Sequence, residues 1–152
     1  MSKGLRRSFA AEIEKGQVIV YPKGVWNKDE VLKFSSDRVG LTRGSVLQQG
    51  VDGNSILVPL TTVDKIVEEL KLPRVDFIKM DIEGAEKQAL AGSRRTLVDH
   101  RPRMAICVYH LHEDPVEIPK LARAIVPGYQ TRCQCLNYSE YIEGEVTHFY
   151  HY

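Results

Sequence analysis

Residues 75–90 read VDFIKMDIEGAEKQAL, and this stretch decides how the chain is expected to fold. Its first half is an apolar strand pattern that ends at Met80, and Asp81, Glu83 and Gly84 then lead directly into a helical pattern. In open α/β sheets, ligands bind at turns of this kind, which follow the carboxyl end of a strand. The sequence therefore predicts a functional edge that begins at Asp81.

Strand and helix patterns alternate along the rest of the chain. Such alternation is typical of a mainly parallel sheet, and two late strands without a helix between them indicate an antiparallel edge. We therefore expect one α/β domain over residues 1–152, with a mainly parallel sheet and an antiparallel C-terminal edge. The predicted strands are 17–21, 31–34, 56–60, 75–80, 104–109, 131–136 and 146–150, and the predicted helices are 3–15, one between Thr62 and Pro73, 84–98 and one that stops at Pro127.

Individual residues predict where these elements begin and end. Gly16 is placed to end the first helix, and Pro59 indicates a strand that lies at a sheet edge or ends early. The last helix has two possible starts. One is a capping box of Asp114 with Glu117, and the other places Pro119 at the first helical position.

Composition limits the classes of function. Lys and Arg (21) nearly balance Asp and Glu (20), so no strong field predicts binding to nucleic acid or to an anionic membrane. No apolar run approaches the roughly 20 residues that span a bilayer, and no signal peptide opens the chain. We expect a cytoplasmic protein.

Cys107, Cys133 and Cys135 are interpreted as buried reduced thiols, and Trp26 as a buried aromatic anchor.

Polar residues follow three of the predicted strands. If these strands are neighbours, their carboxyl ends bring the polar residues to one rim. The three groups are Asp81 to Glu83, then His110, His112 and Glu113, and finally Asn137 and Tyr138.

The carboxylates of this rim have a structural interpretation beside the functional one. Negative charge at a helix N-terminus is stabilising by itself, by about 0.3–1 kcal/mol, and Glu83 could also pair with Lys87 four residues later. Glu86 fits that interpretation less well, because on a helical wheel it falls in the apolar arc of Ala89 and Leu90. An inward carboxylate needs a partner.

The two histidines are candidates to work with Asp81 as a general base or as ligand groups. His110 is preferred because it directly follows the strand, and His112 is second; a surface or structural role is the alternative. Carboxylates and histidines together could bind a metal ion, but no spacing here is specific to one, and no metal is predicted.

The segment KMDIEGAE (79–86) closely resembles the Lys-hydrophobe-Asp-hydrophobe-Glu-Gly-Ala-Glu signature of the FkbM-type S-adenosylmethionine-dependent methyltransferases. The resemblance extends along nearly the whole chain. It includes VIVYPKGVW (18–26), LKF (32–34), VPLTTVD (58–64) with Val63 in place of leucine, LAGS (90–93) with Ser93 in place of alanine, Arg101-Pro102 and Tyr109-His110.

This resemblance implies a Rossmann-like methyltransferase sheet that is truncated at its N-terminus. The family binds its cofactor through a glycine-rich turn after the first strand and an acidic residue that ends the second, and neither is found upstream of Gln17. In the family's strand order, the first strand lies beside the one that ends at Asp81. Its absence would expose that edge, and a homodimer could form through it.

The function implied is methyl transfer from S-adenosylmethionine to a small-molecule acceptor, a hydroxyl of a sugar or secondary metabolite. Asp81 is assigned to the junction of cofactor and acceptor with Glu83 beside the cofactor, and His110 to general base or acceptor positioning. Glu86 and His112 are assigned to substrate positioning. Two alternatives remain open: a non-catalytic relic or binding module of the same fold without cofactor affinity, and a metal-dependent hydrolase.

Overall fold

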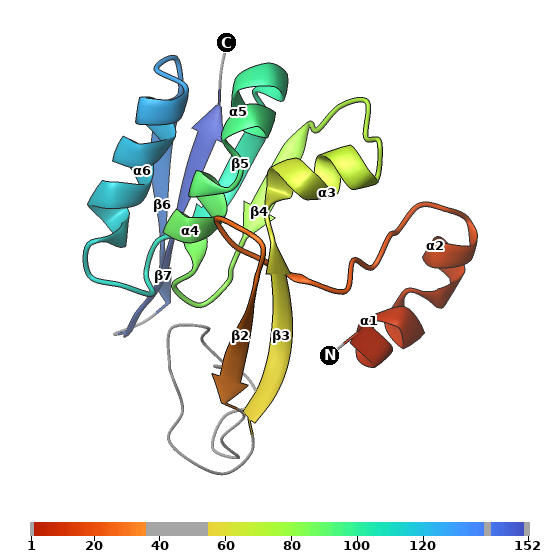
Figure 1. The fold of residues 1–152 in the computed structure, drawn as a ribbon. Helices are drawn as coiled ribbons and strands as arrows, with labels where there is room; N and C mark the ends of the chain where they lie inside the picture. Colours follow the sequence, from red (N-terminus) through yellow and green to blue (C-terminus); the bar gives the residue numbers. More distant parts are fainter. Residues whose placement is uncertain (1, 36–54, 139–140, 151–152) are drawn as a thin grey trace.

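The computed structural model describes residues 2–35, 55–138 and 141–150 (Figure 1). Helices and strands alternate through most of this part of the chain, as the sequence predicts. In chain order the elements are α1 (Ser2–Ser8), α2 (Ala10–Glu14), β1 (Gly24–Val25), β2 (Glu30–Ser35), β3 (Ser55–Thr61), α3 (Val63–Glu69), β4 (Phe77–Met80), α4 (Glu86–Ala91), α5 (Arg94–His100), β5 (Arg103–Cys107), α6 (Asp114–Ile125), β6 (Gln130–Tyr138) and β7 (Tyr141–Tyr150).

The larger sheet has four strands in the order β4-β5-β7-β6. β4 runs parallel to β5, with Met80 opposite Ile106, whereas β7 is antiparallel to both β5 and β6. The predicted antiparallel C-terminal edge is confirmed. The prediction of a mainly parallel sheet is wrong, because β4 and β5 are the only parallel pair that the structure describes in this sheet. β4 lies at one edge of the described sheet and β6 at the other.

A second sheet has three strands in the order β1-β3-β2 and carries the region around Pro59. β3 is its middle strand, but β1 pairs with it only at Leu60 and Thr61. At Pro59, β3 therefore has β2 as its neighbour on one side, with Pro59 opposite Val31. The expectation of an edge-like position holds locally, because a proline lacks the amide that a second neighbour would need.

The N-terminal segment lies apart from the two sheets (Figure 1). The predicted helix 3–15 is divided at Phe9, whose φ of −112° and ψ of 29° are not helical. Gly16 ends α2 with a φ of 70°, as predicted. The predicted strand 17–21 does not form. Its apolar residues find no neighbouring strand in the described part of the chain, and Ile19 is exposed.

Three helices, α4, α5 and α6, cover one face of the larger sheet (Figure 1). The predicted helix 84–98 is divided between α4 and α5 at Gly92 and Ser93, where Ser93 Oγ donates a hydrogen bond to the carbonyl of Ala89 at 2.6 Å. The main core under these helices consists of Met80, Ala89, Leu90, Leu97, Met104, Ile106, Val108, Ile118, Ala122, Ile125, Val126, Tyr129 and Phe149.

Helix α6 begins earlier than either predicted start. Its N-cap residue is Glu113, and Pro119 lies inside the helix. Asp114 is buried and accepts a hydrogen bond from the amide of Leu111 at 3.0 Å, so its carboxylate stabilises the turn before the helix.

Two predictions on individual side chains are confirmed. Trp26 is buried in a smaller cluster with Leu60 and Ala85, and Cys107 is a buried free thiol. The side chains of the other two cysteines lie outside those that the structure describes. Among the described residues, no helix is long and apolar enough to cross a membrane.

Candidate functional site

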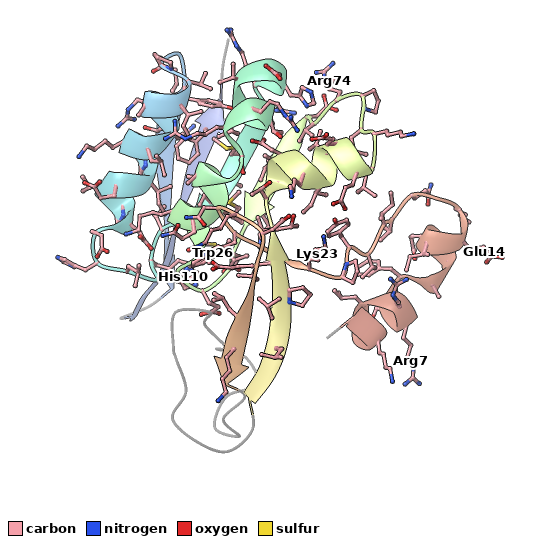
Figure 2. The ribbon with its side chains drawn as sticks, in the orientation of Figure 1. Arg7, Glu14, Lys23, Trp26, Arg74 and His110 are labelled. Atoms are coloured by element: carbon pink, nitrogen blue, oxygen red, sulfur yellow. The ribbon has the colours of Figure 1, made fainter. Side chains whose placement is uncertain are left out.

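The candidate site lies where the parallel strands β4 and β5 end side by side. Asp81 follows Met80 at the end of β4, and Tyr109 and His110 follow β5. Figure 2 shows His110 at the lower end of the larger sheet. The predicted convergence of these two loops is confirmed, because Met80 and Ile106 are paired at the same level of the sheet.

The turn from β4 into α4 is tight and conformationally demanding. Glu83 has a φ of 57° and Gly84 a φ of 91°, both in the left-handed region, which non-glycine residues rarely adopt. Glu86 Oε1 accepts a hydrogen bond from the amide of Ile82 at 2.9 Å and so holds the turn. Positive φ at a non-glycine residue is a form of strain that gathers at functional sites.

Glu86 points into the core, as its position on the helical wheel predicts. Its side chain is 0% exposed, and its partner is the His110 ring, with Nδ1 at 3.1 Å from Oε1. The predicted pair of Glu83 with Lys87 is not formed. Glu83 lies in the turn rather than in α4, and Lys87 instead pairs with Glu113 at 2.9 Å and with Asp114 at 3.4 Å.

His110 connects the buried carboxylate with the rim. Its Nε2 lies 3.7 Å from Asp81 Oδ1 and 3.6 Å from Glu83 Oε2, on the side of the ring opposite Glu86. The side chain is 8% exposed, whereas those of Asp81 and Glu83 are 37% and 35% exposed. Thus the two rim carboxylates reach solvent and the histidine lies behind them.

Tyr109 is a site residue that the sequence did not identify. Its hydroxyl donates a hydrogen bond to Asp81 Oδ1 at 3.2 Å, and its ring lies 4.3 Å from that of His110. In a continuing strand, Tyr109 and His110 would point to opposite faces. Because β5 ends at Cys107, both side chains reach the Asp81 group.

The neighbours of Asp81 set its charge state. Burial alone would raise the pKa of Asp81, but the hydrogen bond from Tyr109 and the nearby Lys79 ammonium outweigh it and lower the pKa below its ordinary value. Burial, with the charge of Asp81, raises the pKa of Tyr109. Asp81 is therefore an ionised carboxylate at neutral pH, and Tyr109 remains its protonated donor.

His112 and Glu113 are not brought into this group. Both are exposed. The Glu113 carboxylate bonds to Lys87, which lowers the pKa of Glu113. Asn137 and Tyr138 belong to strand β6 itself, and their side chains lie outside those described. Among the described residues, no group of three or more His, Cys, Asp or Glu could hold a metal ion.

Comparisons with known proteins agree with the resemblance seen in the sequence. The family model of the methyltransferase FkbM domain matches residues 2–133. The search of curated proteins gives no significant match.

One solved structure is similar in fold, the crystal structure of methyltransferase FkbM from Methylobacillus flagellatus KT, with a TM-score of 0.66 and 22% identity. The match covers 97% of this chain and 32% of the other, so this chain spans about a third of that protein's length. Since the family model covers most of the chain, the protein belongs to the FkbM methyltransferase family.

Proposed function

We propose that this chain takes part in methyl transfer from S-adenosylmethionine to a hydroxyl of a sugar or secondary metabolite. The observation that supports this proposal is the convergence of Asp81, Glu83 and His110 at the ends of two neighbouring parallel strands, in a chain of the FkbM family. The finer parts of the proposal, namely the cofactor, the oxygen acceptor and the residue roles, come from the resemblance in sequence.

The rim fits one part of such a cofactor. S-adenosylmethionine carries a sulfonium and an ammonium group, and two partly exposed carboxylates, Asp81 and Glu83, favour positive charge beside them. Glycine-rich backbone and an acidic residue for the ribose hydroxyls are absent from the sequence upstream of Gln17. The fit is therefore to the charged end of the cofactor, and the adenosine end has no counterpart among these features.

When bound, the cofactor supplies an electrophilic methyl group, and the protein must hold the acceptor oxygen in line with it. We assign Asp81 to the junction of the two molecules, because it is ionised and fixed by Tyr109 and Lys79. We assign Glu83 to cofactor binding beside Asp81, as the resemblance implies. Glu86 is fully buried, so any effect it has on the substrate passes through His110 or through the turn that it holds at Ile82.

Calorimetric titration of S-adenosylmethionine and S-adenosylhomocysteine into the 152-residue chain tests this proposal. We expect micromolar binding that Asp81→Asn weakens by about tenfold or more. Asp76→Asn is the matched control, since Asp76 lies at the opposite end of β4 in an exposed pair with Arg74. Equal affinities for the two variants would reject the assignment of Asp81.

The acceptor class needs a separate experiment. The chain is incubated with S-adenosylmethionine labelled in the methyl group and with a panel of sugars and hydroxylated metabolites, and products are identified by mass spectrometry and NMR. An O-methyl product supports the proposal. Methylation at nitrogen or carbon alone would reject the oxygen acceptor and leave the cofactor assignment standing.

The non-catalytic alternative predicts a folded sample without measurable affinity for either ligand. The metal-dependent hydrolase gains no support from the described residues, which hold no metal-binding group. A cytoplasmic location and a single partial domain over residues 1–152 stay predictions.

A further inference from the structure

The His110 ring is enclosed by carboxylates in a way that limits where its protons can be. Nδ1 lies 3.1 Å from the buried Glu86, and Nε2 lies 3.7 Å from Asp81 and 3.6 Å from Glu83. Neither nitrogen makes a hydrogen bond of standard geometry with the described residues. The Tyr109 ring lies against the imidazole, tilted by 39°.

Both neutral forms of the ring are unfavourable in this place. A neutral imidazole carries one proton, and its other nitrogen presents a lone pair. A proton on Nδ1 leaves the Nε2 lone pair facing Asp81 and Glu83, and a proton on Nε2 leaves the Nδ1 lone pair facing Glu86. Ionised carboxylates only accept hydrogen bonds, so either arrangement sets lone pairs against negative oxygens.

The charge balance of Glu86 leads to the same result. A fully buried carboxylate stays ionised only with a cation nearby, and Glu86 Oε2 has no hydrogen-bond partner among the described residues. The two lysines of the β4–α4 region have other partners: Lys79 pairs with Asp81, and Lys87 pairs with Glu113 and Asp114. In the described part of the chain, His110 makes the ion contact of Glu86.

We propose that His110 carries a proton on both ring nitrogens and bridges Glu86 to Asp81 and Glu83 as a cation. His110 is then a positioning residue that fixes the two rim carboxylates, and it cannot take a proton from the acceptor. This inference deepens the proposed function. The positioning role of His110 rests on that function, whereas its protonation state does not. Of the two roles that the resemblance implies for His110, it selects positioning over general base.

The same chain contains an internal reference. His100 Nδ1 accepts a hydrogen bond from the amide of Val75 at 3.1 Å, so that nitrogen must carry a lone pair. Nitrogen-15 NMR distinguishes protonated from bare ring nitrogens. In the free protein near neutral pH, we expect two protonated nitrogens for His110 and one bare nitrogen for His100, with the signals assigned through His110→Gln and His100→Gln.

A bare ring nitrogen on His110 in the wild-type spectrum would overturn the proposal. One such outcome is a neutral pair, in which Glu86 carries a proton and His110 Nδ1 is bare. Because the spectrum is recorded without cofactor, the result does not depend on whether S-adenosylmethionine binds.

Two variants sharpen the test. Glu86→Gln removes the buried charge that faces Nδ1, and we expect one bare ring nitrogen on His110 in this variant. Glu113→Gln is the control, because Glu113 is exposed and pairs with Lys87 instead. A folded Glu86→Gln protein whose His110 signals match those of the wild type would reject the bridge. If that variant fails to fold, the wild-type spectrum still decides.

Discussion

Asp64 on α3 caps helix α5 through Thr96. Its Oδ1 accepts hydrogen bonds from the Thr96 amide at 2.8 Å and from the Thr96 hydroxyl at 2.7 Å, and Oδ2 accepts one from the Arg95 amide at 3.0 Å. Thr96 is 2% exposed. A side chain from another helix thus satisfies the first amides of α5, whose own N-cap residue Ser93 makes no such bond.

We expect Asp64→Ala to destabilise the fold by about 1–3 kcal/mol, because it leaves two helix amides and a buried hydroxyl without an acceptor. Urea unfolding followed by circular dichroism measures the change. Glu68→Ala is the control on the same helix, since Glu68 is exposed and its carboxylate bonds to the Arg95 side chain. Equal midpoints for the two variants would contradict the capping role.

Gly92 lies against the backbone of the loop that carries Trp26. A Cβ atom at this position would lie 2.1 Å from the Trp26 carbonyl oxygen and 3.1 Å from Asn27 Cα. The Trp26 backbone cannot easily withdraw, because its amide donates to the Thr61 carbonyl at 2.7 Å. The close approach, not a special backbone conformation, requires glycine, since the φ of Gly92 is −85°.

We expect Gly92→Ala to lower the free energy of unfolding by about 1–3 kcal/mol and to displace the loop that carries Trp26. Trp26 is the single tryptophan of the chain and is buried, so its fluorescence reports the displacement directly. Gly4→Ala is the control, because nothing lies within 4 Å of its added Cβ. An unchanged emission spectrum and midpoint for Gly92→Ala would show that the loop yields without cost.

The sequence predicted those parts of the site that follow from local geometry. Helical periodicity placed Glu86 inside, and the meeting of two strand ends brought Asp81 to His110. Both depend on neighbours within a few residues or on a general property of parallel strands.

Other features depend on tertiary neighbours that no local pattern contains. Residues 17–21 have a strand pattern but no strand to pair with in the described structure, and β propensity mainly reflects such packing. Gly92, where the predicted helix is divided, lies against the backbone of Trp26, 66 positions earlier in the chain. The role of Tyr109 could not be predicted because it depends on where β5 ends.

Tyr129 links stability to alkaline pH. It is 1% exposed, its hydroxyl donates to the Pro102 carbonyl at 2.7 Å, and burial raises its pKa to about 12. In the unfolded chain, a tyrosine loses its proton near pH 10. Between about pH 10 and 12 the unfolded state therefore binds fewer protons than the folded state, and the free energy of unfolding falls as pH rises.

Loss of the Tyr129 proton lowers the free energy of unfolding by about 2–3 kcal/mol in total across that pH range. At neutral pH, the free energy of unfolding of Tyr129→Phe should be lower by about 1 kcal/mol, because the Pro102 carbonyl loses its donor. Between about pH 10 and 12, the free energy of unfolding of this variant should fall less steeply than that of the wild type. Urea unfolding at several pH values measures both slopes. The other tyrosines are common to both proteins. If the free energy of unfolding fell with pH equally in the wild type and in Tyr129→Phe, the assignment to Tyr129 would be refuted.

Among the described strands, β4 has a neighbour on one side only, and its other edge is where we expect two copies of the chain to associate. The Asp76 carbonyl accepts from the Arg103 amide at 3.0 Å, so by alternation the backbone groups of Ile78 and Met80 also face β5, and those of Phe77 and Lys79 face outward. Phe77 is 55% exposed beside this edge. An unpaired edge with an exposed aromatic side chain favours strand pairing between molecules.

Lys79→Pro removes the outward amide without touching the pairing with β5, whereas Lys79→Ala keeps that amide and removes the same charge. We expect sedimentation velocity to show a concentration-dependent dimer for the wild type and Lys79→Ala, and a monomer for Lys79→Pro. A wild-type chain that stays monomeric at every concentration would exclude the dimer. Dimers of equal strength in Lys79→Pro would place the interface elsewhere, because the only group absent from Lys79→Pro and present in Lys79→Ala is the amide that the paired edge needs.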